Sequence, residues 1–235
     1  MADNVHKGHR ERLRKKFIEE GIDALNDHQV LEYILFYAIP YRDTNPLAHK
    51  LINEYGSLSA VFDAKPQILK AAGYSDNVIG LIKLIPEISR RYHIDKTQNR
   101  SKIVETNRLC EYFEPRFIGR TNEVLYLLLL DSKSKEVFSG IISQGTVKES
   151  DVPIRKIIQL AMTYDATAAV IAHNHPGGMA LPSLDDIRTT KSVTKALDVV
   201  GIELIDHIIV SDDDSISLAQ SRWAENGIFI ADSEV

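Results

Sequence analysis

Seven consecutive apolar residues, Val124–Leu130, place the strongest constraint on how this 235-residue chain can fold. A membrane helix needs about 20 apolar residues, so the run is too short to cross a bilayer, but it has the usual length of a β-strand. No polar residue alternates with the apolar ones, so both faces of the strand have to be buried. The run therefore predicts a strand inside a sheet that is covered on both sides.

The second half of the chain alternates between strand-like and helix-like segments. Strands are expected at residues 123–130, 137–143, 168–172 and 203–210, with a short piece at 215–218. Amphipathic helices are expected at residues 106–113, 153–163 and 183–197. Elements mixed in this order predict a three-layer α/β sandwich around one central sheet.

The first half has helical periodicity instead, with capping residues such as Asp27 and stop signals such as Gly21 and Gly56. Pro86 lies within the last of these helical patterns and predicts a kink or a local end. A polar stretch follows and has no apolar period. We therefore expect a helical domain at residues 1–93, a linker at 94–103 and an α/β domain at 104–235.

Composition limits the classes of protein to which the chain can belong. Hydrophobic residues make up 44% and charged residues 26%, which is typical of a globular protein. The basic, polar start has no apolar core after it and does not indicate a secretory signal. A single cysteine, Cys110, allows no internal disulfide and no cysteine-based zinc site. We expect a cytoplasmic protein without a membrane segment.

The formal net charge of −5 argues against bulk binding of nucleic acid. The charge is unevenly distributed. Residues 1–100 carry 15 Lys and Arg against 13 Asp and Glu, and the remainder carries 13 against 20. The excess of negative charge therefore belongs to the second half.

Two histidines at the end of a predicted strand are the first candidates for chemistry. His173 and His175 are two residues apart, so in an extended chain their rings point to the same side. Asp186 follows Ser183 by three residues, and this spacing places both side chains on one face of a helix. If the intervening loop folds back, His173, His175 and Asp186 provide the donor set of a catalytic zinc site with one open position.

Other interpretations of these residues stay open at this point. Ser183-x-x-Asp186 is also the pattern of a helix capping box, which needs no metal and is compatible with one. His207, in an apolar strand, is expected to be a hydrogen-bonded core histidine, with support of a metal ligand as the lesser alternative.

A site of this kind also needs a carboxylate that moves protons without binding the metal. Glu123, Glu136 and Glu149 are the upstream candidates. Glu136 is expected to be solvated at a hairpin turn, and Glu149 falls in a polar loop. Glu123 heads the apolar strand and is the preferred general acid/base, although a plain charge at a strand start explains it too.

Taken together, Glu123, His173-x-His175-Pro176 and Ser183-x-x-Asp186 resemble the JAMM motif of the JAB/MPN metalloprotease superfamily. The fuller sequence is similar to the RadC family, which includes proteins of the UPF0758 type. Further similarities stand at residues 129–131, 145–146, 152–153 and 201–209, and in the first half at 27–31, 55–58 and 72–74. One departure is Gly177, where that family usually has serine.

The resemblance implies an α+β protein in which an all-α, helix-hairpin-helix-like domain precedes a JAB/MPN domain. The second domain would be three-layered and cytidine-deaminase-like, with a mixed sheet. His173, His175 and Asp186 would bind Zn²⁺, Glu123 would be the general acid/base, and Ser183 would stabilise the oxyanion. The implied reaction is hydrolysis of an amide bond in a protein or peptide substrate.

Two alternatives to a peptidase remain. The first is a DNA-binding or nuclease-like accessory protein, in keeping with the family's old link to DNA repair. Hairpins of the implied kind hold phosphates at helix N-termini, but here the turn offers Gly73 alone, and Asp76 is unfavourable to phosphate. The second is a non-catalytic scaffold, against which the complete motif argues.

Overall fold

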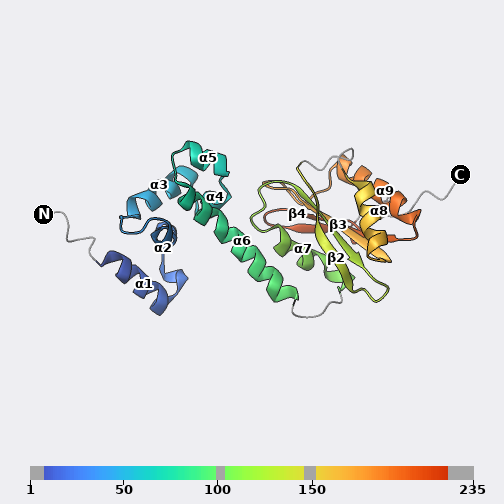
Figure 1. Ribbon diagram of the computed structural model, residues 1–235, viewed down its shortest axis with the longest axis horizontal. Helices are drawn as coiled ribbons and strands as arrows, with labels where there is room; N and C mark the ends of the chain where they lie inside the picture. Colours follow the sequence, from blue (N-terminus) through green and yellow to red (C-terminus); the bar gives the residue numbers. More distant parts are fainter. Residues whose placement is uncertain (1–7, 99–103, 146–151, 222–235) are drawn as a thin grey trace. The chain divides into compact units, whose positions relative to one another are not determined.

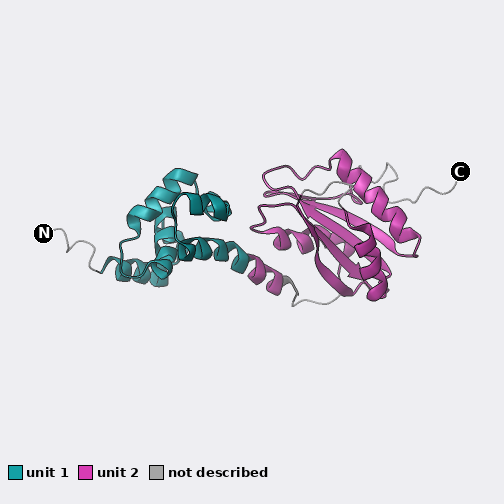
Figure 2. Ribbon diagram, turned by 45° about the horizontal axis from the view of Figure 1, so that its top comes forward, with its two compact units in different colours: residues 1–89 teal, residues 90–235 magenta. Residues whose placement is uncertain are grey.

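The computed structural model describes residues 8–98, 104–145 and 152–221 (Figure 1). The chain divides into two compact units, Met1–Ser89 and Arg90–Val235 (Figure 2). In the described parts of the chain, no helix is both long enough and apolar enough to cross a membrane.

The first unit is helical. Its elements are α1 (His9–Glu20), the 3-10 turn η1 (Ile22–Ala24), α2 (Asp27–Ala38), α3 (Asn45–Tyr55), α4 (Leu58–Asp63), α5 (Pro66–Ala71) and the first part of α6 (Asp76–Gln98). Leu31, Leu35, Leu51 and Ile82 are fully buried in its core. The apolar periodicity of the sequence therefore corresponds to a packed helical core.

A buried carboxylate joins three of these helices. Glu32 of α2 is fully buried, and its oxygens lie 2.9 Å from His9 Nε2 of α1 and 3.0 Å from Asn45 Nδ2 of α3. Both oxygens are thus hydrogen-bonded, as a buried carboxylate requires. The arrangement fixes the packing of α1 and α3 on α2.

Helix α6 differs from its expected length. It runs through Pro86 without ending there, and it continues to Gln98. Residues 94–98, expected to begin a linker, are therefore helical, and residues 99–103 lie outside the described parts of the chain. Buried Val78 and Ile82 precede the proline and buried Arg90 follows it. Packing on both sides thus holds the helix across a residue that weakens it.

The second unit contains a sheet and its covering helices. In chain order these are η2 (Thr106–Arg108), α7 (Leu109–Phe117), β1 (Val124–Leu130), β2 (Glu136–Gln144), α8 (Ile154–Thr163), β3 (Ala168–Asn174), α9 (Leu184–Asp198), β4 (Glu203–Val210) and β5 (Ser215–Ser217). The strands lie in the order β2-β1-β3-β4-β5. Strands β3 and β4 are parallel and the other neighbours antiparallel, so the sheet is mixed.

The apolar side chains form one core on each face of this sheet. Leu125, Leu127 and Ile171 pack with α8 and α9, whereas Leu128 and Ala172 pack with α7. The apolar run Val124–Leu130 is therefore buried on both faces, as its composition requires. The expected α+β class, with a helical region before a three-layer domain and a mixed sheet, is confirmed (Figure 1).

Two elements extend beyond their sequence-predicted ends. Helix α7 continues past Pro115 to Phe117, whose ring is buried with Phe113 against the sheet. Strand β3 continues from Ala172 through Asn174, because its pairing with β4 extends to Val210. This second extension places His173 on the strand itself rather than in the following loop.

Candidate metal centre

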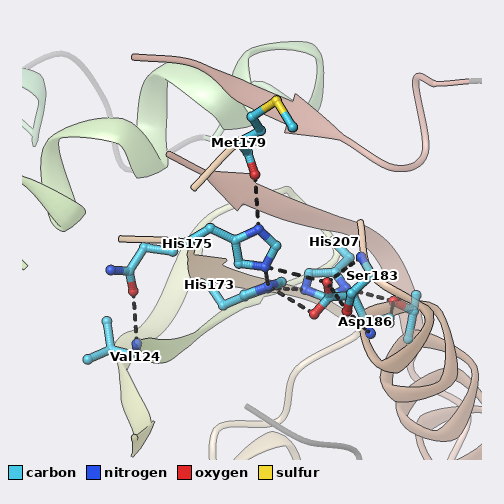
Figure 3. A network of polar contacts seen from close by, with 9 residues as sticks. Val124, His173, His175, Met179, Ser183, Asp186 and His207 are labelled. Carbon is cyan, nitrogen blue, oxygen red and sulfur yellow. Dashed lines mark hydrogen bonds and ion pairs between the residues drawn. The ribbon is translucent and has the colours of Figure 1, made fainter. Parts of the chain in front are cut away.

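The strand β3 aims two imidazole rings at one point. His173 is its penultimate residue, and the N–H of His175 donates to the Val210 carbonyl of β4 at 2.8 Å, so the extended backbone continues through His175. The alternation of a strand then turns both rings to the face covered by α9, because Ile171 packs on that face. The two Nε2 atoms are 2.9 Å apart (Figure 3).

Asp186 reaches the same point from the first turn of α9. Its Oδ1 is 3.0 Å from His173 Nε2, and its Oδ2 is 3.5 Å from His175 Nε2. The carboxylate is 3% exposed, so water does not satisfy it. The structure thus brings together the three residues that the sequence nominated as metal ligands.

A capping box holds this carboxylate in place. Ser183 Oγ accepts a hydrogen bond from Asp186 N at 3.2 Å, and Asp186 Oδ2 accepts bonds from Ser183 N and Ser183 Oγ, each at 2.7 Å. The capping interpretation is therefore confirmed, and it coexists with the cluster. Oδ2 therefore serves the cap and also lies 3.5 Å from His175 Nε2, whereas Oδ1 faces His173 Nε2.

The donor set fits a zinc ion. Tetrahedral zinc with bonds of about 2.0–2.1 Å holds its donor atoms about 3.3 Å apart. The two Nε2 atoms are 2.9 Å apart, and each faces one oxygen of Asp186, Oδ1 at 3.0 Å for His173 and Oδ2 at 3.5 Å for His175, so the separations are close to this value. In both His173 and His175, the ring nitrogen that points away from the cluster, Nδ1, also has a hydrogen-bond partner. His175 Nδ1 lies 3.0 Å from the Met179 carbonyl, and His173 Nδ1 lies 2.8 Å from His207 Nε2. Such outer partners are typical of metal-binding histidines.

The electrostatics of the cluster favour an anionic carboxylate. Burial alone would raise the pKa of Asp186, but its contacts with His173 and His175 outweigh this effect and hold the pKa far below its usual range. The hydrogen bond with Asp186 raises the pKa of His175. Burial lowers the pKa of His207, which is fully enclosed, so its ring is neutral at pH 7.

Glu123 borders a cleft beside these ligands. The cleft has a volume of about 530 Å³ and is lined by Thr121, Asn122, Glu123, Gln144, Gly145 and Pro176. Leu125 pairs with His173, so continuing the antiparallel register by two residues sets Glu123 opposite His175. Glu123 is also close enough to contribute to the raised pKa of His175.

The other candidate carboxylates are placed differently. Glu136 Oε2 accepts a hydrogen bond from Tyr112 Oη at 2.7 Å, so it is engaged with α7 rather than simply solvated. Glu149 lies outside the described residues. Of the two described candidates, Glu123 is the one that lines the cleft.

One residue that the sequence analysis missed fixes the position of Glu123. Asn174 is buried and points to the opposite face from its neighbours His173 and His175. Its Oδ1 accepts from Val124 N at 2.8 Å, and its Nδ2 donates to the carbonyls of Arg120 and Asn122 at 3.3 and 3.1 Å. The segment that carries Glu123 is therefore tied to the residue between the two histidines. The His-x-His spacing indicates a role for its first and third residues only, so it gives no sign of the contacts that Asn174 makes.

Comparison with known proteins identifies the family to which the chain belongs. Residues 103–223 match the family model described as "RadC-like JAB domain". The chain belongs to the RadC-like JAB domain family. A UPF0758 protein of Fusobacterium nucleatum subsp. nucleatum is 32% identical over 228 residues, which cover 94% of this chain and 98% of that protein. A UPF0758 protein of Idiomarina loihiensis is 32% identical over 211 residues, or 89% and 94% of the two chains.

Membership of the RadC-like JAB domain family and the three convergent donors agree on one region of the chain. All three donor residues fall inside the matched segment, as do Glu123 and Ser183. The segment that matches the family, residues 103–223, therefore lies within the second unit and contains the cluster.

Proposed function

We propose that this RadC-like chain is a zinc-dependent hydrolase of the JAMM type that cleaves an amide bond in a peptide or protein. The observation that carries the proposal is the convergence of His173, His175 and Asp186 to donor separations of 2.9–3.5 Å, beside a cleft lined by Glu123. Two nitrogens and one carboxylate oxygen are the donor number and type of catalytic zinc sites.

The chain's own groups divide the chemistry between them. A bound zinc ion supplies Lewis-acid activation of water and of the substrate carbonyl. Glu123 takes a proton from the attacking water and delivers it to the leaving amine. Asn174 keeps Glu123 at the rim of the cleft through its three backbone contacts.

Ser183 is assigned to the oxyanion of the tetrahedral intermediate. Its hydroxyl now donates to Asp186 Oδ2 at 2.7 Å, and it lies in the same turn as the ligand. Rotation about its Cβ–Oγ bond redirects the hydroxyl proton toward a substrate oxygen while Oγ still accepts from Asp186 N. A donor of this kind strengthens as negative charge develops on that oxygen.

The lining of the cleft favours a peptide over a nucleic acid. Among its six described lining residues there is no Lys or Arg, and Glu123 is acidic. A phosphodiester substrate needs compensating positive charge, which these residues do not supply. In the first unit, Arg10 donates to the carbonyl of Ile39 at 2.7 Å and stacks on Phe36, so one cation of the basic segment has a structural use.

The test is metal analysis combined with an activity screen on the full chain. We expect one zinc per chain in the wild type and none in His173→Ala or Asp186→Ala. Glu123→Gln should retain zinc but lose hydrolysis of a peptide panel by at least about 100-fold, the usual contribution of general acid/base catalysis. Absence of zinc from the wild-type protein would remove the proposal.

The DNA-associated alternative is separated by a gel-shift titration against salt. Binding that weakens steeply with salt, together with an inactive peptide panel, would favour the alternative. Peptide hydrolysis that depends on Glu123, without DNA binding, favours the hydrolase.

A further inference from the structure

A chain of buried hydrogen bonds connects the candidate ligand His173 with the main chain of the candidate ligand Asp186. His173 Nδ1 lies 2.8 Å from His207 Nε2, and His207 Nδ1 lies 2.6 Å from Thr190 Oγ1. Thr190 Oγ1 in turn lies 2.7 Å from the main-chain oxygen of Asp186. His207 and Thr190 are both fully buried, so water does not complete these contacts.

The fold brings these groups together on one side of the sheet. His207 pairs with Ile171 in the parallel ladder of β3 and β4, so it faces the helix α9 as Ile171 does. Thr190 lies one turn after Asp186 on α9, and it therefore lies on the same face of the helix. Neither His207 nor Thr190 is part of the JAMM pattern.

The direction in which each of these hydrogen bonds is donated follows from the Asp186 carbonyl, at which the series ends. The carbonyl of Asp186 can only accept, so the single hydroxyl proton of Thr190 is donated to it. Thr190 Oγ1 must then accept from Nδ1–H of His207. His207 is fully buried, which disfavours a charged ring, so it carries one N–H and its Nε2 accepts from Nδ1–H of His173. The lone pair on His173 Nε2 is thereby left facing the cluster.

We propose that His207 and Thr190 are positioning residues that fix the metal-binding tautomer and ring orientation of His173. This inference rests on the proposed metal centre. The opposite direction of donation would place a proton on Nε2 of His173, which is the form that cannot bind a metal. Thr190 prevents this because its own proton is committed to Asp186.

Four variants of the full chain test the assignment. Thr190→Val keeps the shape of the side chain and removes the acceptor of His207 Nδ1–H. His207→Leu removes the acceptor of His173, and His207→Gln restores one through its amide oxygen. Thr194→Val is the matched control, because Thr194 is buried on the same helix one turn beyond Thr190, to whose carbonyl it donates at 2.9 Å.

Two readouts are used besides activity. Zinc affinity is measured by competition with a chromogenic chelator, and the tautomers of His173 and His207 are assigned by ¹⁵N NMR of the metal-free protein. We expect Thr190→Val and His207→Leu to weaken zinc binding by about 10–100-fold, the usual effect of losing such a partner. His207→Gln should recover most of this loss, and Thr194→Val should match the wild type. In the wild type, the NMR should show protonated Nδ1 on both histidines.

Folded Thr190→Val and His207→Leu proteins that bind zinc like Thr194→Val would overturn the inference, as would a wild-type His173 that lacks the Nδ1 proton. If His207→Leu does not fold, Thr190→Val and His207→Gln still decide the outcome. A wild type that binds no zinc would remove the proposed metal centre, and the tautomer assignment alone would then decide for or against the hydrogen-bond chain.

Discussion

The two oxygens of Asp186 have different partners. Oδ2 accepts from the backbone and hydroxyl of Ser183, whereas Oδ1 faces His173 Nε2 at 3.0 Å. A single side chain therefore both caps α9 and completes the cluster of donors. This division allows the two contributions to be separated by substitution.

Replacing Asp186 with asparagine should remove metal binding while leaving the fold intact. An amide oxygen can still accept from Ser183 N, but the charge that balances a divalent cation is gone. We expect zinc affinity to fall by at least about 100-fold, since a ligand matters more than the outer partners whose loss costs 10–100-fold. Asp185→Asn is the control, because Asp185 lies on the same turn with a side chain that is 48% exposed, and it pairs with Arg188. Equal affinities measured for the two variants by chelator competition would contradict the assignment of Asp186.

Ser183→Ala should combine a loss of stability with a loss of rate. Removing an N-cap hydroxyl costs about 1 kcal/mol of unfolding free energy. Ser57 caps α4 in the same way, accepting from Ala60 N at 3.1 Å, so Ser57→Ala is the matched control. Urea titrations should show similar losses for both variants, and only Ser183→Ala should reduce kcat. A kcat unchanged by Ser183→Ala would leave the serine with the cap alone.

At the level of elements, Asn174 at the end of β3 holds the backbone at the start of β1 in place. Asn174→Ala removes three hydrogen bonds that hold residues 120–124 and leaves one buried N–H without a partner. We expect a loss of about 1–3 kcal/mol in unfolding free energy. Because Glu123 is then less fixed, kcat should fall while zinc affinity stays within about twofold of the wild type, a split that steady-state kinetics and chelator competition resolve. A parallel fall in zinc affinity would show that Asn174 acts on the histidines instead.

The connection between β4 and β5 depends on another buried carboxylate, that of Asp206. Asp206 is 1% exposed and accepts from His207 N, Ala219 N and Ser217 Oγ. Burial raises its pKa despite these bonds. The folded state therefore binds this proton more tightly than the unfolded chain does, and stability falls as pH rises from the unfolded pKa of about 3.9 through the folded value.

Asp206→Asn should abolish the fall in stability with rising pH, and it should be at least as stable as the wild type at pH 7. Its amide oxygen can accept from the two N–H groups, and its amide nitrogen can donate to Ser217 Oγ. Asp206→Ala leaves those donors unpaired and should cost about 1–3 kcal/mol at the same pH. Urea unfolding across pH 4–8 measures both effects. A pH profile of Asp206→Asn parallel to that of the wild type would contradict the raised pKa.

These elements also show what the sequence can and cannot predict. His173, His175 and Asp186 were predictable because strand alternation and helix spacing are local rules. Asn174 and Thr190 were not, because their partners depend on which strands pair and where α9 packs. The continuation of α7 past Pro115 was missed for a related reason, since burial of Phe117 outweighs the local penalty of proline.

For the whole molecule, the two compact units should respond differently to metal. All three candidate ligands belong to the unit Arg90–Val235. A ligand present at 100 times its dissociation constant stabilises the folded state by about 2.7 kcal/mol, and it does so only for the cooperative unit that binds it. We expect calorimetry to show two unfolding transitions, and we expect zinc to raise the midpoint temperature of only one of them.

The assignment of the transitions is checked with Asp186→Asn, in which neither should move when zinc is added. A single transition that moves as a whole would show that the two units unfold together. A zinc-dependent shift retained by Asp186→Asn would place the metal elsewhere in the chain.

The sharing of Asp186 between a helix cap and the cluster of donors has a consequence for dynamics. The first turn of α9 is closed by the same carboxylate that would hold the ion, so occupancy of the site and fraying of that turn are thermodynamically linked. Zinc should slow the exchange of amide protons around Asp186 with deuterated solvent more than that of amides at the distant end of the helix. The start of α9 then becomes a reporter of whether a metal ion occupies the candidate site.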